Sequence, residues 1–355
     1  MSDNSDMKKR LFNNFKEIEK KIDNIPEEDK VVQDTTLLLD ISYLFKSHFS
    51  TNTATTEDGI PIAGISGVIN NIYKFVNRFN SQKVICIFDG KKSRKRRREI
   101  LESYKGNRDE QGNIRTPFDL NENSLKDLEK LQMRVLYELI GMMPVKRLYF
   151  EELEADDVIG YITKTFFRDK KGRRVIVSED RDFYQLIDDH TQVYHPRKKL
   201  LVGRSNFRDH WDTIPENVIY YRIIEGDSSD NIKGVKGWGT KTIEKFFPEI
   251  KKEKIESFED FDQLIESKRG TLLNTKTGAK IINQKEVLPD NFKLMDLTQT
   301  MLTPDERLKV RAIIEKKVKQ SLNDFYEFKS RCDELNLSST IYMRSMQLLF
   351  NSLKY

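Results

Sequence analysis

Cysteine is scarce in this sequence, whose 355 residues include only Cys86 and Cys332. Two cysteines give no disulfide framework. The histidines also pair with no cysteine at the spacing of a structural zinc site; they are His48, His190, His195 and His210. Neither cross-links nor a structural zinc ion is therefore expected, and an apolar core must hold the fold together.

Long apolar runs are missing as well. No segment approaches the ~18 apolar residues of a membrane-spanning helix, and the opening Met1-Ser2-Asp3-Asn4 lacks the apolar core of a signal peptide. With 37% hydrophobic and 34% charged residues, the composition is that of a soluble protein, which we expect in the cytoplasm. A chain of 355 residues can bury a sizeable core, and we expect two sub-domains.

Positive charge is concentrated rather than spread. The formal net charge is only +5. Between Lys91 and Arg108, however, nine lysines and arginines face two glutamates. Such clustering usually marks a solvated helix face, and here it also suits a track for phosphate groups.

Residues 1–34 form an N-terminal extension in this interpretation. Apolar residues alternate at spacings of four and three before a break at Pro26, which predicts a short amphipathic helix; they are Leu11, Phe15, Ile18, Ile22 and Ile25. We expect the helix to pack on the body of the protein. The alternative is a docking helix for a partner.

Three apolar runs have the length and continuity of strands covered on both faces: they are Thr36–Ile41, Lys83–Gly90 and Arg174–Asp180. Apolar residues at helical spacing lie between them, over residues 68–79, 125–140 and 154–167. Strands that alternate with helices predict an α/β fold with a mostly parallel central sheet flanked by helices. Beyond Gly203 we expect a turn at 274–278, an extended segment at Phe292–Leu297 and helices from Pro304 onward.

Carboxylates stand at the ends of the predicted strands. Asp40, Asp89 and Asp180 each finish one of the three runs, and Asp182 follows two residues later. Because ligand sites of open α/β sheets lie outside the carboxyl ends of the strands, we expect these side chains to meet at one edge.

A second group of carboxylates crowds the start of the predicted helix at 154–167. Glu154, Asp156 and Asp157 share its first turn. A helix N-terminus favours an anion by only about 0.3–1 kcal/mol per charge, so capping needs one or two of the three. Adjacent carboxylates repel one another, and a hard cation such as Mg²⁺ or Mn²⁺ would cancel that repulsion. A capped surface helix is the alternative interpretation.

A glycine-rich segment runs from Gly234 to Thr242. Gly234, Gly237 and Gly239 permit a tight hairpin whose backbone N–H groups approach a phosphate closely. Lys241 and Thr242 would add charge and a helix start. The order of residues does not match a nucleotide-binding P-loop.

Six motifs occur in a fixed order: Leu38-Leu39-Asp40, Phe88-Asp89, Tyr104-Lys105-Gly106-Asn107-Arg108, Glu154-Ala155-Asp156-Asp157, Ser178–Leu186 and Gly226–Asn231. Together with the glycine hairpin they resemble the 5′ nuclease, or flap endonuclease, family, which includes the 5′–3′ exonuclease domain of bacterial DNA polymerase I. The sequence looks most similar to the stand-alone bacteriophage 5′–3′ exonucleases of the ribonuclease H type. The resemblance covers roughly residues 35–300.

The resemblance implies a role for each matching residue. Asp40, Asp89, Glu154 and Asp156 match the acids of a first metal ion, and Asp157, Asp180, Asp182, Asp227 and Asp230 those of a second. Lys105 matches a lysine on the scissile phosphate, Arg108 a second basic residue, and Tyr104 an aromatic on which a terminal base stacks. The residues implied to bind DNA are Arg94, Arg96, Arg97, Gly234, Lys236, Gly237, Gly239, Lys241 and Thr242. One departure is Glu152, which stands where the family often has glycine.

The implied organisation has three parts. Residues 1–34 are the extension, 35–202 the α/β nuclease core with a helical arch at about 91–135, and 203–355 a helical DNA-binding sub-domain with a helix–hairpin–helix at about 227–247. The implied cofactors are two Mg²⁺ ions, with Mn²⁺ as an alternative, and K⁺ at the hairpin.

The implied activity is metal-assisted hydrolysis of branched or 5′-flapped duplex DNA and of RNA–DNA hybrids, for primer removal in phage replication. We expect a monomer in the bacterial host cytoplasm, with a phage single-strand-binding protein or a sliding clamp as conceivable partners. Two alternatives stay open. One is a single-strand ribonuclease of the related PIN type, and the other is a non-catalytic binder of DNA junctions.

Overall fold

The computed structural model describes residues 34–107, 117–118, 120–317 and 322–353. The chain divides into Met1–Gln33 and Asp34–Tyr355, and only the second unit is described below. The amphipathic helix predicted for residues 1–34 therefore lies outside the described residues. Within the described ranges, no helix is long and apolar enough to cross a membrane.

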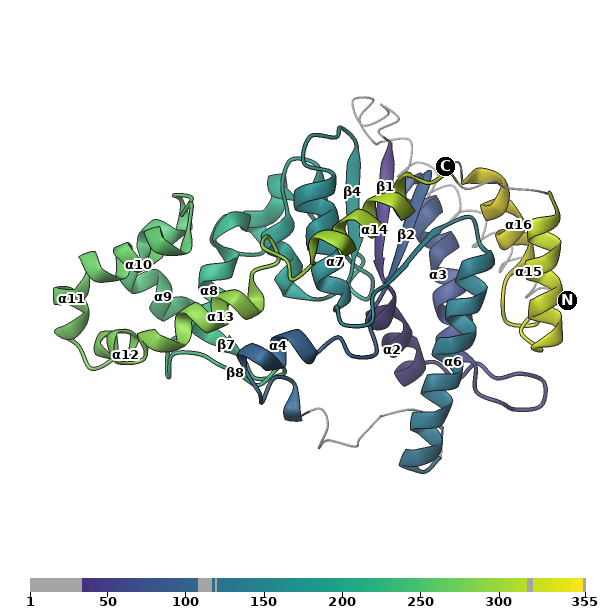
Figure 1. Cartoon of the computed structure of the whole chain (residues 1–355), viewed down its shortest axis with the longest axis horizontal. Coiled ribbons are helices and arrows are strands. Elements are labelled where there is room, and N and C mark those ends of the chain that lie inside the picture. The colour runs from purple at the N-terminus through teal and green to yellow at the C-terminus, as the bar shows by residue number, and fades with distance from the viewer. Residues whose placement is uncertain (1–33, 108–116, 119, 318–321, 354–355) are drawn as a thin grey trace, which may run out of the picture. The chain divides into compact units, whose positions relative to one another are not determined.

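Six strands of the described chain form one sheet in the order β3-β2-β1-β4-β5-β6. They are β1 (Thr35–Asp40), β2 (Lys83–Phe88), β3 (Lys146–Tyr149), β4 (Arg173–Val177), β5 (Thr191–His195) and β6 (Leu200–Val202). Figure 1 shows β4, β1 and β2 side by side. Every pair is parallel except β5–β6, so the predicted mostly parallel sheet is confirmed. From β1 the chain builds outward to β2 and β3, then returns to build β4 and β5 on the other side. The direction of winding therefore changes between β1 and β4.

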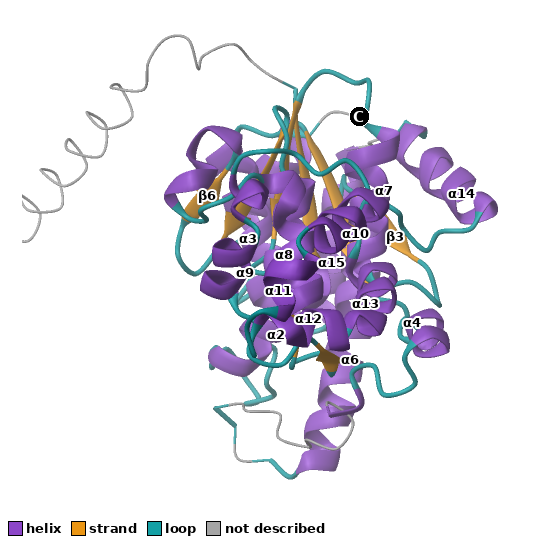
Figure 2. Ribbon diagram, turned by 90° about the vertical axis from the view of Figure 1, so that its left-hand side faces the viewer, coloured by secondary structure: helices purple, strands orange, loops and turns teal. Residues whose placement is uncertain are grey.

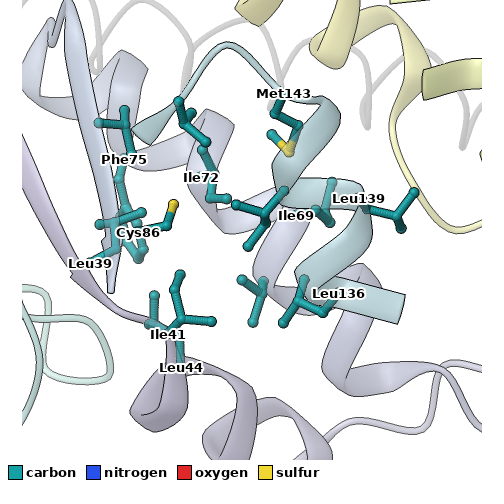
Figure 3. Close-up of a cluster of buried hydrophobic side chains, with 14 of the residues drawn as sticks. Leu39, Ile41, Leu44, Ile69, Ile72, Phe75, Cys86, Leu136, Leu139 and Met143 are labelled. Carbon is teal, nitrogen blue, oxygen red and sulfur yellow. The ribbon is translucent and has the colours of Figure 1, made fainter. Parts of the chain in front are cut away.

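Strand β1 is buried on both faces, as its continuous apolar run predicts. Leu37 and Leu39 pack into one apolar cluster and Leu38 into another on the opposite face, because successive side chains of a strand alternate. Figure 3 shows the first cluster, with Cys86 of β2 beside Leu39 and Phe75. That cysteine acts as a small apolar side chain.

Helices cover both faces of the sheet (Figure 2). The first cluster contains residues of α3 (Ala63–Phe79) and α6 (Glu122–Met142), together with α15 (Leu322–Glu334) and α16 (Met343–Ser352). The second contains residues of α7 (Ala155–Tyr161) and α14 (Pro304–Glu315). The helix predicted at 154–167 changes at Ile162 from α-helix to a π-helical turn, Ile162–Phe166.

A third apolar cluster is centred on Tyr221, Phe247 and Phe261. It joins helices α8 (Val218–Glu225), α9 (Thr240–Phe246), α10 (Phe258–Ser267), α11 (Arg269–Leu273), α12 (Gly278–Asn283) and α13 (Leu288–Met295). The C-terminal helices α15 and α16 do not join it, and α16 lies against α3 instead (Figure 1). Helices from the expected sub-domain at 203–355 therefore pack in all three apolar clusters.

One secondary-structure prediction is wrong. Phe292–Leu297 was expected to be extended, but most of it belongs to helix α13. Leu288, Asn291, Leu294 and Met295 are the buried residues of this helix, at spacings of three, three and one. The short window at 292–297 hid that helical period. The turn expected at 274–278 is confirmed between α11 and α12.

The remaining elements are short or were not foreseen. Helix α2 (Ile41–Thr51) follows β1 directly, and α4 (Lys95–Ile100) lies in the basic segment. Strands β7 (Gly226–Asp227) and β8 (Ile232–Lys233) pair as a small hairpin. The 3₁₀ turns are Arg181–Leu186, Arg204–Asp209, Pro215–Asn217, Pro248–Lys251 and Lys285–Val287.

Candidate active site

A cavity of about 420 Å³ opens at the carboxyl edge of the sheet, where the winding direction changes. Seven carboxylates line it: Asp40, Asp89, Glu154, Asp156, Asp180, Asp227 and Asp230. We call this the acidic cavity. The structure thus brings together seven of the nine acids singled out as metal ligands, from segments as far apart in sequence as β1 and β7.

Helix starts fix the two acids on the central strands. Asp40 caps α2, where its Oδ1 accepts a hydrogen bond of 3.0 Å from the Tyr43 backbone N–H, and Oδ2 accepts one of 3.2 Å from the Ser178 hydroxyl. The Asp89 Oδ1 accepts a hydrogen bond of 2.8 Å from the backbone N–H of Ala155, the first residue of α7. Each carboxylate is therefore oriented by a backbone that the sheet holds in place.

Glu154 is surrounded by donors. Its carboxylate accepts hydrogen bonds from Lys105 Nζ at 2.7 Å and from the Tyr104 hydroxyl at 2.9 Å, and Arg97 lies 3.1 Å away. Burial alone would raise its pKa, but the charges of Arg97 and Lys105 together with these hydrogen bonds lower the pKa to about 2. Glu154 is therefore an anion throughout the physiological range.

The neighbouring aspartates behave in the opposite way. Burial raises the pKa of Asp40 to about 7, and the charges of Asp89 and Asp180 add to the effect. Burial and the charge of Glu154 raise the pKa of Asp156, and burial raises that of Asp180. Their negative charges are under-compensated by the protein. A divalent cation would supply the missing positive charge, and an all-oxygen set of donors fits Mg²⁺.

The acidic side chains of the cavity do not form a metal coordination sphere in this conformation. Among the described residues, no three histidine, cysteine or acidic side chains are close enough to hold one metal ion together. Lys105 lies between two of the acids instead, with Nζ 2.7 Å from Glu154 and 3.6 Å from Asp230. The residues fit a hard cation by their chemistry, and the lysine provides part of the counter-charge.

Two of the nine acids do not line the cavity. Asp157 is 2% exposed and turns to Arg97, with which it forms two hydrogen bonds of 2.6 and 3.2 Å. Asp182 accepts a 2.5 Å hydrogen bond from Arg222, whose other nitrogen lies 2.6 Å from Asp227. Each of these two acids therefore pairs with an arginine that also contacts one of the carboxylates lining the acidic cavity.

The arginines predicted to bind DNA lie in different environments. Arg97 is buried in its pairs with Asp157 and Glu154, and Arg96 makes two 2.8 Å bonds to Glu306. Arg97 does not line the acidic cavity, and Arg96 lines a separate pocket with Glu152 and Glu306. Arg94 does line a groove, and Arg108 lies outside the described residues.

Tyr104 also differs from its expected role. The ring is 2% exposed and packs in the third apolar cluster, and the hydroxyl group binds Glu154. A base cannot stack on a ring covered in this way. In this conformation the tyrosine positions the glutamate.

A basic groove of about 740 Å³ adjoins the acidic cavity. The two share Lys46, Asp89, Lys105 and Glu154, and the groove is otherwise lined mainly by the positive segment, including Lys91, Lys92, Arg94, Lys95 and Arg98. The positive segment predicted to follow phosphates therefore leads to the acids.

Some site residues were missed in the sequence. Lys46 lines both cavities from α2, a helix that the sequence did not reveal. Arg197 reaches the acidic cavity from the β5–β6 turn and donates a 2.7 Å bond from Nε to Glu179. Ser178, which belongs to one of the six motifs, donates a hydrogen bond to Asp40. The only available signal in the sequence was the short spacing, since Lys46 follows Asp40 by six residues.

The glycine segment forms the turn between β8 and α9. A Cβ at Gly234 would lie 2.2 Å from the Glu225 carbonyl carbon, and Gly237 has φ +83°, so both positions require glycine. Trp238 anchors the turn by donating a 2.9 Å bond to the Thr277 carbonyl. Lys236 and Lys241 are left exposed to solvent, with Gly239 between them.

The raised pKa values predict how stability depends on pH. A carboxyl whose pKa is higher in the folded state stabilises the fold below its unfolded pKa, and this contribution is lost as pH rises through the folded pKa. Asp40 and Asp182, both with a folded pKa of about 7, should therefore make the metal-free protein less stable as pH rises from about 4.5 to about 7, by on the order of 1 kcal/mol per group and pH unit, with little further change above about pH 8. Glu154 titrates far below this range.

Thermal melts in EDTA across this pH range measure the effect, and Mg²⁺ should restore more stability at the alkaline end. Asp40→Asn should flatten the pH dependence. Equal melting temperatures for the wild type at both ends of the range would contradict the prediction.

The sequence and the structure were compared with those of known proteins. A family model described as the 5′-3′ exonuclease N-terminal resolvase-like domain matches residues 35–212. A 5′-3′ exonuclease of Buchnera aphidicola subsp. Schizaphis graminum is 31% identical over 202 residues, which are 56% of this chain and 64% of that protein. The chain therefore spans a little under two thirds of that relative.

Two solved structures share the fold. The T5 5′-exonuclease with bound zinc superposes with a TM-score of 0.60 at 22% identity, over 85% of this chain and 99% of that one. The bacteriophage T5 D15 flap endonuclease, in a complex with DNA and metal ions, gives a TM-score of 0.61 at 22% identity over the same shares.

Proposed function

The chain belongs to the 5′-3′ exonuclease family, and we therefore propose that it is a divalent-metal-dependent 5′ nuclease. It hydrolyses phosphodiester bonds at 5′ ends or flaps of duplex DNA, both as a flap endonuclease and as a 5′–3′ exonuclease. The observation that carries the proposal is the acidic cavity, in which seven carboxylates and Lys105 meet at the end of a basic groove.

The acidic cavity is the proposed site of two Mg²⁺ ions, with Mn²⁺ as an alternative. Asp40, Asp89, Glu154 and Asp156 would hold one ion, and Asp180, Asp227 and Asp230 the other. Bound divalent ions supply an activated water and neutralise charge on the transferring phosphate. Asp157 and Asp182 support these ligands through Arg97 and Arg222.

Lys105 is the proposed contact to the scissile phosphate. Its backbone has φ +52°, which is rare outside glycine, and its N–H donates a 2.8 Å bond to the Asp230 carbonyl. That conformation holds the lysine where the cavity and the groove meet. Its ammonium can then stabilise charge that develops on the phosphate oxygens, and Arg108 is assigned beside it by resemblance.

Duplex DNA is proposed to contact the basic groove and the glycine turn. Phosphate contacts are blind to sequence, so shape would select the substrate. Lys236, Lys241 and Thr242 lie at the turn in a proposed helix–hairpin–helix with a K⁺ site, and residues 91–135 form the proposed arch for the 5′ strand. The T5 structure in complex with DNA supports a DNA substrate.

The wider role rests on the resemblance to phage enzymes. We place the protein as a monomer in primer removal during phage DNA replication, acting also on RNA–DNA hybrids in the host cytoplasm. A single-strand-binding protein or a sliding clamp is the proposed kind of partner.

An end-labelled 5′-flapped duplex tests the proposal. In Mg²⁺ the protein should release the flap near the branch, and EDTA should stop the reaction. Cleavage should slow steeply as salt rises, because displaced counterions dominate phosphate binding. Preferred cutting of linear single-stranded RNA would indicate a PIN-type ribonuclease instead, and tight flap binding without any cutting would indicate a junction binder.

A further inference from the structure

A third cavity lies at the opposite edge of the sheet from the acids. It is formed by the first residues of the strands, including Thr36 of β1 and Ile85 of β2, together with the segments that follow the π-helical turn and α14. We call it the amino-edge pocket. Thr36 precedes Asp40 by four residues on β1, which separates the pocket from that acid by about 13 Å of strand. No lining residue is shared with the acidic cavity or the basic groove.

The pocket is strongly positive. Seven of its lining residues are lysine or arginine and two are acidic. Asp34 pairs with Lys83 at 2.5 Å, and Glu315 lies 3.8 Å from Lys170. The lining residues therefore carry a surplus of five positive charges, one of which, Arg174, pairs at 3.5 Å with Asp188 outside the pocket.

Three of the cations have no acidic partner. Within the described residues Lys171, Lys316 and Lys317 form no ion pair, and all three are exposed at the pocket rim. The charge of one of them acts on a neighbour: burial lowers the pKa of Lys146, and the charge of Lys316 lowers it further. An anion in the pocket would relieve this repulsion.

A fixed arginine and an apolar wall complete the pocket. Arg174 is 3% exposed and donates bonds of 3.4 and 3.0 Å to the carbonyls of Phe167 and Lys170, which hold that segment in shape. Ile85, Phe166 and Ile314 line the wall, and the Lys170 ammonium lies 3.6 Å from the centre of the Phe166 ring. The pocket therefore offers a cation directly above an apolar surface.

These features define the ligand by its chemistry. Clustered lysines favour a multiply charged phosphate, and an apolar wall favours an attached ring. The volume of about 270 Å³ is just below the range of roughly 300–1,000 Å³ that is usual for ligand pockets, so the pocket suits at most one nucleotide and not a length of duplex. We propose that the amino-edge pocket binds a nucleoside phosphate, either free or as the terminal nucleotide of a strand.

Calorimetric titration of the full chain with deoxyadenosine monophosphate tests this site. EDTA is present, so no metal can recruit the ligand to the acids. We expect a dissociation constant of about 1 mM or tighter. Deoxyadenosine, which lacks the phosphate, should not bind measurably. A 5′-phosphorylated hexanucleotide identifies the source: binding through the same lysines would mark a strand end, and its failure to bind would mark the free nucleotide.

A double variant tests whether the ligand binds in the amino-edge pocket. Lys171→Glu with Lys317→Glu changes two exposed rim residues and should weaken binding at least about tenfold, because attraction turns into repulsion at short range. The matched control, Lys74→Glu with Lys252→Glu, makes the same change of net charge on exposed lysines elsewhere and should bind like the wild type.

Equal weakening in both double variants would overturn the proposal, as would wild-type affinity in the pocket variant or no binding by the wild type. Binding of an acidic peptide but not of the nucleotide would also overturn it, in favour of a protein partner. Since no metal or cleavable bond enters the titration, the result is independent of the proposed nuclease activity.

Discussion

Asp156→Asn should reduce Mg²⁺-dependent cleavage by on the order of 10³-fold, since losing a metal ligand removes several kcal/mol of transition-state stabilisation. The variant should still fold, and in EDTA it should be at least as stable as the wild type. Burial and the charge of Glu154 raise the pKa of Asp156, so its ionised form opposes folding. Single-turnover cleavage of the flap substrate and thermal melts measure the two effects.

The adjacent aspartate provides the matched comparison. Asp157→Asn leaves Arg97 without one of its carboxylate partners and should lower stability, while Mg²⁺ affinity measured by calorimetry should stay within a few-fold of the wild type. If Asp157→Asn abolished metal binding while Asp156→Asn preserved cleavage, the placement of the two side chains would be wrong.

Arg97→Ala should lower the free energy of unfolding by about 3–5 kcal/mol, because it leaves buried carboxylates without their counter-charge. Arg97 is 3% exposed and joins three elements: it bonds to Asp157 of α7, lies 3.1 Å from Glu154 and donates from Nε to the Leu294 carbonyl of α13. Urea denaturation in EDTA measures the loss.

Arg197→Ala is the control for this second prediction. Its side chain is 71% exposed and that of its partner Glu179 is 13% exposed, so water screens the arginine and can replace it beside Glu179, and the loss should be about 1 kcal/mol. A loss for Arg97→Ala no larger than that for Arg197→Ala would mean that water replaces the buried partner. Pairing Arg97→Leu with Asp157→Leu should recover part of the stability, since it removes one of the stranded charges.

Sequence alone located the edge of the sheet where the acids gather. Asp40, Asp89 and Asp180 each follow an apolar run, and parallel strands carry their carboxyl ends to the same side. That inference needs only the order of strands and helices. It could not tell which of Asp156 and Asp157 faces the cavity. Neighbours on a helix point in directions about 100° apart, and Arg97, which pairs with Asp157, lies sixty residues earlier in the sequence.

The environments of the arginines and of Tyr104 could not be predicted from the sequence either. A run of positive residues indicates a phosphate track, but burial of Arg97 and Tyr104 depends on packing between α4, α7 and α13. Helix α2, which begins directly after β1, was not predicted from the sequence, and the role of Lys46 depends on that helix. Long-range partners decide which members of a cluster face the ligand.

The hydrogen bonds of Asp40 and Asp89 have a consequence for how the site fails. Each carboxylate commits one oxygen to the first turn of a helix, α2 or α7, and the second oxygen of Asp40 also accepts a hydrogen bond from Ser178, so the lone pairs that are left can bind an ion. A mutation that frays either helix start would misplace a ligand, and a mutation of either ligand would loosen a helix start. A mutation of Asp40 or Asp89 should thus reduce both catalysis and folding stability, whereas a mutation of Asp156 should reduce catalysis without reducing stability.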